Sequence, residues 1–395
     1  MEGKRILQEA KEILDWLIDI RRDFHENPEL SLEEFRTQEK IINYLKGMGI
    51  KDITKMANTG VVATIKGKRL GKGKVVALRA DMDALPIKDN KSVPYKSKIE
   101  GKMHACGHDA HMTILLGAAR ILKSKEDNFS GVVKLIFQPA EETVGGADIM
   151  IESGVLDNPR VDSIFGLHVS SEIPTGHIGI RYGQMNAASD EIKITIEGVS
   201  THGAYPHDGV DAIVVSAQVI SVLQTIVSRN VDPRKSAVLT LGTIRGGTQE
   251  NIVANKVEMT GTIRTLDMDT RKMVIDRLKK TVENVAEGFG AIGIVEIIEG
   301  YPHLINDNNM VEMVENNAIE LLGHNNIHKI DIPSLGVEDF GYFLQKIPGA
   351  FYRLGCRNEV KGIIHQTHND LFDIDEDCLA VGVALQVKNA LKVLD

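Results

Sequence analysis

The segment from about Met185 to Gly300 contains a complete series of predicted elements: strand, helix, strand, strand, helix, strand. The strands are short apolar runs such as EIKITIEG and VEMTGTIRTL, and the first helix is expected from Val210 to Ser228. This β-α-β-β-α-β order is the split arrangement of a ferredoxin-like unit. Because the order is self-contained, we predict a second domain inserted at 185–300. One continuous α/β domain is the alternative.

Short β-type runs also fill the region before this insertion, namely GVVATIKG, KVVALRAD, GVVKLIFQPAE and DSIFGLHV. A helical pattern, DAHMTILLGAARILKSK, lies between the second and third runs. Strands that alternate with helices indicate an α/β layer with buried strands. In open α/β sheets, ligands gather beyond the carboxyl ends of the strands. The polar residues at these ends can therefore meet in space; they are Asp81, Asp83, Glu141, Glu142 and His168.

A helix start is predicted near the segment SLEEF. Ser31 precedes Glu34 by three residues, which is a capping-box pattern. The helix should end within YLKGMG, because Gly47 and Gly49 stop it.

The composition is that of a globular chain. Of the 395 residues, 43% are hydrophobic and 26% are charged. That length is too great for one ordinary core and suits two domains. The formal net charge of −9 argues against a nucleic-acid partner or an anionic membrane surface, where a basic patch would be expected.

Neither the N-terminus nor the cysteines indicate export. The N-terminal sequence MEGKRILQEAKEILDWL lacks the apolar core of a signal peptide. The longest near-apolar run, VDAIVVSAQVISVLQTIV, is interrupted by Asp211, Gln218 and Gln224, which favours a buried helix over a membrane span. Three cysteines do not make a disulfide framework, so we expect a cytoplasmic protein.

The stretch HACGHDAH concentrates metal-binding residue types. Cysteine and histidine are common ligands of transition metals, and Gly107 between Cys106 and His108 permits a tight turn. Asp109 is placed to cap the helix that follows, and the dipole of that helix would stabilise a thiolate at its N-terminus. The stretch therefore favours a metal site, for which Cys106 and His108 are candidate ligands.

Two other interpretations of this stretch stay open on the residues alone. His104, His108 and His111 have the spacing i, i+4, i+7, which is one face of a helix that begins earlier. Alternatively, the stretch is an ordinary helix start with solvated histidines and a buried free cysteine.

Other fragments supply further ligand types. Glu141 and Glu142 are adjacent, and adjacent carboxylates repel unless a cation or proton compensates them. One of the two can bind metal while the other acts as a general base. HQTHNDLFDIDE adds His365 and His368 near the C-terminus. Each fragment alone suits a solvated turn or a core histidine, but together they are what a two-metal hydrolase needs.

The ordered motifs resemble the M20 metallopeptidase family; they are RRDFHENPELS, LRADMDALP, HACGHDAH, FQPAEE, GLHV, THGAYPH, GTIRT, GVEDF and HNDLFDIDE. The most similar branch holds N-acyl-amino-acid amidohydrolases, hippurate hydrolases, auxin-conjugate hydrolases and certain carboxypeptidases. The resemblance implies an α/β fold: a two-metal exopeptidase-like catalytic domain with an inserted ferredoxin-like lid or dimerisation domain. The catalytic domain would occupy 1–184 and 301–395.

The resemblance also implies a set of metal ligands for two divalent ions: Cys106, His108, Glu142, His168 and His368. Zinc or manganese is expected, with cobalt or nickel as alternatives. In relatives the last motif usually reads His-Ser-Pro-x-Phe, whereas this chain has HNDLF without the proline. His365 is therefore the alternative to His368. His104 and His111 are not expected to be ligands.

Roles in catalysis follow from the same resemblance. Glu141 would be the general base that moves a proton from water to the leaving amine, and Asp83 would orient the site. His202 of THGAYPH would reach into the partner subunit's site and stabilise the oxyanion. The roles of Asp81 and His207 stay unassigned.

Asn251 and Arg264 resemble residues that bind the substrate carboxylate. For Arg264 a surface strand residue is an equal alternative.

The sequence thus predicts a cytoplasmic, homodimeric two-metal hydrolase. It would release a free amino acid from N-acyl-amino acids or from the C-terminus of short peptides. An N-acetyl-diaminopimelate-type deacetylase and a carboxypeptidase are the alternatives within the family. A non-catalytic metal-binding relative is the alternative from another class. Higher oligomers stay open, and neither nucleic acid nor membrane is expected as a partner.

Overall fold

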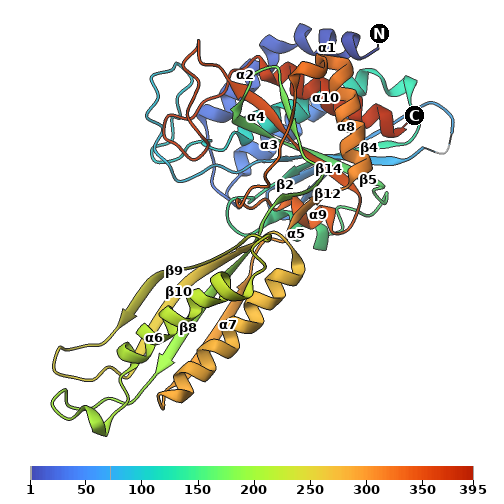
Figure 1. Ribbon diagram of the computed structural model, residues 1–395. Coiled ribbons are helices and arrows are strands. Elements are labelled where there is room, and N and C mark those ends of the chain that lie inside the picture. The colour runs from blue at the N-terminus through green and yellow to red at the C-terminus, as the bar shows by residue number, and fades with distance from the viewer. Residues whose placement is uncertain (1, 72, 395) are drawn as a thin grey trace. The chain divides into compact units, whose positions relative to one another are not determined.

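The computed structural model describes residues 2–71 and 73–394 and divides into two compact units (Figure 1). The first unit comprises Met1–Gly183, Ile305–Ile332 and Asp339–Asp395. The second comprises Gln184–Leu304 and Pro333–Glu338. This division differs from the expected one at Gln184, 301–304 and 333–338, which belong to the second unit.

The first unit contains an eight-stranded mixed sheet with the order β1-β2-β4-β3-β5-β14-β6-β13. Its strands are β1 (Asp52–Met56), β2 (Gly60–Lys66), β3 (Val75–Asp81), β4 (Val132–Gln138), β5 (Ser163–Pro174), β6 (Ile178–Ile180), β13 (Ile327–Lys329) and β14 (Gly349–Arg357). The four predicted apolar runs are confirmed as β2 to β5. Since β3 runs parallel to both β4 and β5, their carboxyl ends lie at one edge of the sheet.

Helices pack around this sheet and supply much of the core. They are α1 (Glu2–Glu12), α2 (Leu14–Glu26), α3 (Phe35–Gly47), α4 (His108–Ser124), α5 (Gly146–Glu152), α8 (Asn308–Leu322), α9 (Phe340–Leu344) and α10 (Cys378–Leu394), with the short turns η1 (Glu126–Asn128) and η4 (His324–Asn326). The apolar helices α4 and α10 pack against each other and are buried along most of their length. Burying α4 fixes the residues at its N-terminus.

The predicted capping box before α3 is wrong, although the predicted end at Gly47 is confirmed. The N-cap residue Glu34 makes no side-chain bond to α3; the Glu29 carboxylate instead accepts from Arg36 N at 3.1 Å and from Thr37 N at 2.8 Å. Ser31 Oγ instead donates to Asp83 Oδ2 at 2.7 Å. The buried Glu34 carboxylate accepts from Thr59 Oγ1 at 2.6 Å and from Ala140 N at 2.9 Å. Both side chains are thus used in contacts that are distant in sequence.

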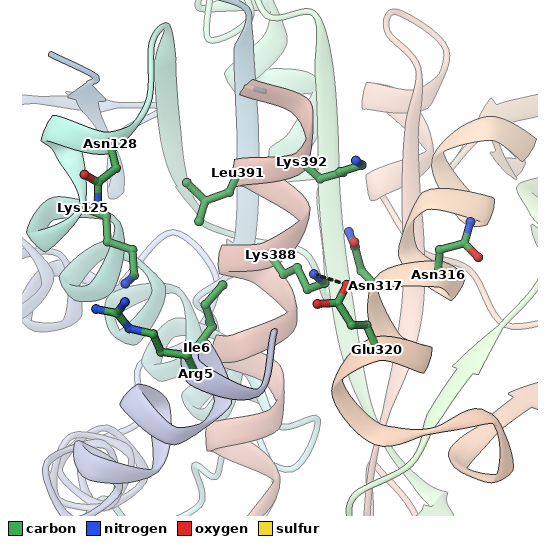
Figure 2. A pocket seen from close by; sticks show the side chains of 10 residues that line it. All are labelled: Arg5, Ile6, Lys125, Asn128, Asn316, Asn317, Glu320, Lys388, Leu391 and Lys392. Carbon is green, nitrogen blue, oxygen red and sulfur yellow. Dashed lines mark ion pairs between the residues drawn. The ribbon is translucent and has the colours of Figure 1, made fainter. Parts of the chain in front are cut away.

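A pocket of about 530 Å³ lies among α1, α8, α10 and the end of α4 (Figure 2). Figure 2 shows Lys388 directed toward Glu320, with 2.7 Å between Nζ and Oε2. Lys125 Nζ lies 2.7 Å from Glu9 Oε2. The pocket shares no lining residue with the predicted site. The Lys388–Glu320 pair links α10 to α8, and the Lys125–Glu9 pair links the residue after α4 to α1.

The second unit has its own core and a four-stranded antiparallel sheet with the order β11-β8-β10-β9. Its elements are β8 (Ala188–Glu197), η2 (Pro206–Asp208), α6 (Ala212–Thr225), the π-turn η3 (Ile226–Asn230), β9 (Ala237–Gly246), β10 (Lys256–Thr265), α7 (Met268–Gly288) and β11 (Ile292–Glu299). This is the predicted β-α-β-β-α-β order. Figure 1 shows α6 and α7 side by side against the sheet. A separate two-stranded sheet pairs β7 (Gly183–Asn186) with β12 (Leu304–Asn306).

The run predicted to form a buried helix is buried on one face only. Val215, Val219 and Leu223 of α6 enter the core, whereas about half of the Ile213 and Val214 side chains is exposed. Among the described residues, Ala212–Asn230 is the one helical stretch long and apolar enough to cross a membrane, with a mean hydropathy of 1.5. A single stretch of this kind is weak evidence for a membrane span.

Candidate metal centre

The carboxyl ends of β3 and β4, the middle of β5 and the start of α4 bring the predicted ligands together. Cys106 Sγ lies 3.2 Å from His168 Nε2. Three groups of residues each have ligand atoms within 4.8 Å of one another: Cys106 with His108 and His168, Cys106 with Glu142 and His368, and His108 with Glu141 and Glu142. The groups share members, so they form one continuous cluster of sulfur, nitrogen and oxygen donors. Such a mixed set suits borderline divalent metals.

His108 Nε2 provides the test of whether this cluster fits a cation. The atom is buried and has no hydrogen-bond partner among residues 2–71 and 73–394. It lies 3.8 Å from Glu142 Oε1 and 4.0 Å from Glu141 Oε2. A buried polar atom without a partner is destabilising by about 1–3 kcal/mol. A divalent ion would give this nitrogen a ligand bond and would compensate the two carboxylates, so the residues fit a metal.

Gly107 sets the geometry of the turn between Cys106 and His108. It is the N-cap of α4 and has φ +92, in the left-handed region. A Cβ atom at this position would lie 2.3 Å from Val169 Cγ2, beside His168. The predicted tight turn is confirmed, because only glycine allows both this backbone angle and this approach.

Two predictions about α4 need correction. Since the helix begins at His108, His104 is not on it and the three histidines do not share a helical face. Asp109 is not the N-cap of α4, which is Gly107, but its Oδ1 accepts from the first-turn N–H of Ala110 at 2.9 Å. Its Oδ2 accepts a hydrogen bond from Arg21 Nε at 2.9 Å and lies 2.7 Å from His25 Nδ1. The carboxylate thus serves both the helix start and a buried ion-pair cluster.

Asp83 orients His108. Asp83 Oδ1 lies 3.2 Å from His108 Nδ1, so the other ring nitrogen faces Glu141 and Glu142. Asp83 Oδ2 accepts from Ser31 Oγ and, at 3.0 Å, from the backbone N–H of Glu142. A carboxylate behind a ligating histidine fixes both its tautomer and its direction. Sequence reasoning missed Ser31, whose capping-box spacing suggested another role.

Asp81 and His111 contact each other and hold the strand that carries His168, one of the predicted ligands. His111 Nδ1 lies 2.6 Å from Asp81 Oδ1, and His111 Nε2 accepts from the backbone N–H of Val169 at 2.9 Å. Both ring nitrogens of His111 are therefore occupied. Burial disfavours the Asp81 charge, but His108, His111 and Arg79 hold its pKa well below the usual value. These contacts fix the middle of β5 at Val169, next to His168.

His168 is neutral and aims a lone pair at the cluster. Its Nδ1 donates to the carbonyl oxygen of Val169 at 2.7 Å, which leaves Nε2 as the acceptor facing Cys106. Burial, together with the nearby His111, lowers the pKa of His168 well below its usual value. Burial, with Glu142 nearby, raises the pKa of the Cys106 thiol.

The C-terminal histidine of the cluster is His368. Its Nε2 lies 3.4 Å from Glu142 Oε1, and its side chain is about half exposed at 53%. The Glu142 contact raises the pKa of His368. His365 belongs to no group of three potential ligands in the described part of the chain.

The three predicted residues of the second unit do not lie together. Gly203 N donates to Asn251 O at 2.7 Å, which brings His202 and Asn251 into neighbouring loops beyond the Lys256 end of β10. His202 Nδ1 accepts from Ala204 N at 3.0 Å, which leaves Nε2 as a donor. Arg264 lies near the other end of β10. Arg264 follows Lys256 by eight positions along the strand. At the usual rise per residue this corresponds to a distance of about 26 Å.

Comparisons with known proteins agree with this cluster. The model of peptidase family M20/M25/M40 matches residues 77–392. The chain is 41% identical over 393 residues to thermostable carboxypeptidase 2 of Saccharolobus solfataricus, covering 98% of both chains. It is 41% identical to N-acetyl-L-cysteine deacetylase of Bacillus subtilis, covering 96% of this chain and 88% of the relative.

A solved structure from Bacillus subtilis, described as a dinuclear metal binding peptidase of the M20 family, is 34% identical with a TM-score of 0.85. The match covers 97% of this chain and 99% of the other. The ligand cluster and these likenesses identify a metal-dependent hydrolase of amide bonds. As the motifs predict, the chain belongs to peptidase family M20/M25/M40.

Proposed function

We propose that this hydrolase releases a free amino acid from N-acyl-L-amino acids or from the C-terminus of short peptides. The observation that carries the proposal is the buried His108 Nε2, which faces Glu141 and Glu142 without a hydrogen-bond partner among the described residues. An adjacent pair of carboxylates allows one to hold metal while the other stays available for proton transfer.

Two divalent ions would be held by Cys106, His108, Glu142, His168 and His368. Zinc or manganese is proposed, with cobalt or nickel as alternatives. When bound, such ions acidify a water molecule and polarise the carbonyl of the scissile amide.

Glu141 moves the proton in this proposal. Its side chain is nearly buried at the carboxyl end of β4, and Oε2 lies 4.0 Å from His108 Nε2. The carboxylate accepts a proton from the attacking water and returns it to the leaving nitrogen, so that the amine departs neutral. Asp83 keeps His108 in the orientation that this step requires.

The second unit would act as a lid and dimerisation domain, with His202 serving the partner subunit. The support comes from the separation along β10. If one substrate contacts both His202 and the carboxylate-binding Arg264, the two residues must come from different chains. His202 Nε2 would donate to the oxyanion, and Asn251 would assist from the neighbouring loop. A homodimer is the smallest assembly that meets this requirement.

The substrate is tested by measuring amino-acid release from a panel with zinc, manganese or a chelator. The panel holds N-acetyl, N-benzoyl and N-carbobenzoxy amino acids, N-acetyl-diaminopimelate and dipeptides. Metal-dependent release from acyl-amino acids supports an amidohydrolase, and preference for peptides supports a carboxypeptidase. If no amino acid is released at full metal occupancy, the remaining interpretation is a non-catalytic metal-binding protein.

Glu141→Gln tests the mechanism. We expect unchanged metal content and a fall in turnover of about 10²–10⁴-fold, because the positioned base is lost. Glu152→Gln is the matched control, since it makes the same change at an exposed helical position. Unchanged turnover in Glu141→Gln would remove Glu141 from the mechanism.

Subunit complementation tests the role of His202. Glu141→Gln and His202→Ala should each be inactive alone and should recover part of the activity when mixed. No recovery, with subunit exchange verified, would refute action across subunits. We also propose a cytoplasmic location, because all three cysteines are free thiols.

A further inference from the structure

His368 has a backbone conformation that needs support. Its φ is 63, in the left-handed region that residues other than glycine rarely adopt. Because the side chain is half exposed, packing does not hold it. On one side the backbone is anchored: His368 N donates to Ala105 O at 2.8 Å, beside Cys106.

The second anchor is the turn that follows. Leu371 N donates to the Asn369 side-chain oxygen at 2.9 Å, and Phe372 N donates to Asn369 O at 3.0 Å. These bonds make residues 369–372 a compact turn. A shift of the turn is therefore transmitted to His368.

The 89–91 loop holds this turn from outside. Asn90 N donates to Asp370 O at 3.0 Å, and Asn90 Nδ2 donates to Asp370 Oδ2 at 2.7 Å. Lys91 Nζ donates to Phe372 O at 2.7 Å and is nearly buried. Three hydrogen bonds thus fix the turn that carries His368.

The same loop is connected to the start of α4. Lys91 Nζ also donates to His25 Nε2 at 2.8 Å, and His25 Nδ1 donates to Asp109 Oδ2 at 2.7 Å. Asp109 directly follows His108 in the chain. The loop itself is fixed by Asp89, whose Oδ1 accepts from Lys91 N at 3.0 Å.

We propose that Asn90 and Lys91 are positioning residues that hold His368 against the other ligands of the metal centre. The proposal rests on the proposed function, since it takes His368 as a ligand. A ligand held in place before the metal arrives loses less conformational freedom on binding. The hydrogen bonds from Asn90 and Lys91 to the turn, here called the clamp, therefore raise metal affinity. Asp370, which Asn90 binds, is the second residue after His368.

The experiment swaps the side chains of Asn90 and Asp370, whose contact is exposed. Asn90→Asp sets a carboxylate against Asp370 and should weaken the affinity for one of the two metal ions about 10-fold or more. The double variant Asn90→Asp with Asp370→Asn restores a hydrogen bond of the opposite direction and should recover the affinity. Affinity is measured with Co²⁺ by chelator competition. Lys96→Ala, an exposed lysine close in the sequence, is the control and should bind Co²⁺ as the unchanged chain does.

A second readout needs no metal. In the metal-free protein, hydrogen exchange of residues 369–373 should be faster in Asn90→Asp and normal in the double variant. Lys91→Met should show the same loss of affinity and protection. If Lys91→Met fails to fold, the comparison of Asn90→Asp with the double variant still tests the proposal, because Asn90 is exposed.

His368→Ala separates this proposal from the proposed function. If it weakens Co²⁺ binding while Asn90→Asp and Lys91→Met do not, the clamp is refuted and the ligand assignment stands. If His368→Ala leaves both metal affinities unchanged, His368 is not a ligand, and the assignment and the clamp both fail.

Discussion

Replacing Gly107 by alanine should destabilise the first unit by an amount that the structure allows to be worked out. At φ +92 an L-residue is less stable by about 1–2 kcal/mol. The new Cβ would also lie 2.3 Å from Val169 Cγ2, and overpacking of this kind adds about 1–3 kcal/mol. The free energy of unfolding should therefore fall by about 2–5 kcal/mol.

Gly101 offers a matched control. Its φ is +74, but a Cβ there would meet nothing within 4 Å. Gly101→Ala should therefore lose only the backbone contribution of about 1–2 kcal/mol. The difference between the two variants isolates the contact with Val169.

Urea unfolding of the metal-free protein, followed by tryptophan fluorescence, measures both variants. Trp16 is the single tryptophan, and its ring packs under the guanidinium of Arg120 on α4, 4.6 Å away. The signal therefore reports on the helix that Gly107 starts. If Gly107→Ala and Gly101→Ala lose the same stability, the inferred clash with Val169 does not exist.

Three further predictions follow from buried or capping contacts. Arg21→Met should lower the stability of the first unit by about 3–5 kcal/mol in the same urea assay, because it leaves the buried Asp109 carboxylate without its guanidinium partner. A thiol reagent should label no cysteine in the metal-loaded protein and only Cys106 after chelation, because Cys106 is 7% exposed whereas Cys356 and Cys378 are fully buried; Cys106→Ser should abolish the labelling. Asp211→Ala should lower the stability of the second unit by about 1 kcal/mol by circular dichroism melting, because Asp211 caps α6 through the N–H groups of Ile213 and Val214.

The parts that the sequence predicted are those whose signal is local. The apolar runs of β2 to β5 and the complete order of the second unit lie within short windows, and so does the turn at Gly107. The site could be anticipated because β3 lies parallel to β4 and β5, and β3 and β4 end next to polar residues. His168, expected at a strand end, lies instead in the middle of β5, which continues to Pro174.

The parts that the sequence did not predict depend on distant partners. Asp109 looked like a helix cap, and its Oδ1 does accept from Ala110 N, but its Oδ2 accepts from Arg21, 88 residues away in the chain. Ser31 looked like a capping residue, but its hydroxyl donates a hydrogen bond to Asp83, 52 residues away. For short polar side chains a local cap and a tertiary hydrogen bond compete, and spacing alone does not rank them.

The position of β14 in the sheet has a consequence for the order in which the protein matures. This strand, Gly349–Arg357, lies between β5 and β6, which begin 186 and 171 residues earlier in the chain. A chain still being synthesised therefore has a gap in the middle of its large sheet, and it also lacks His368 and Asp373. The stretch that forms most of the second unit emerges in one piece and needs fewer distant contacts, so it can fold first. Metal loading at the proposed site would then be completed late, because a chain truncated before β14 lacks a central strand of its sheet and His368.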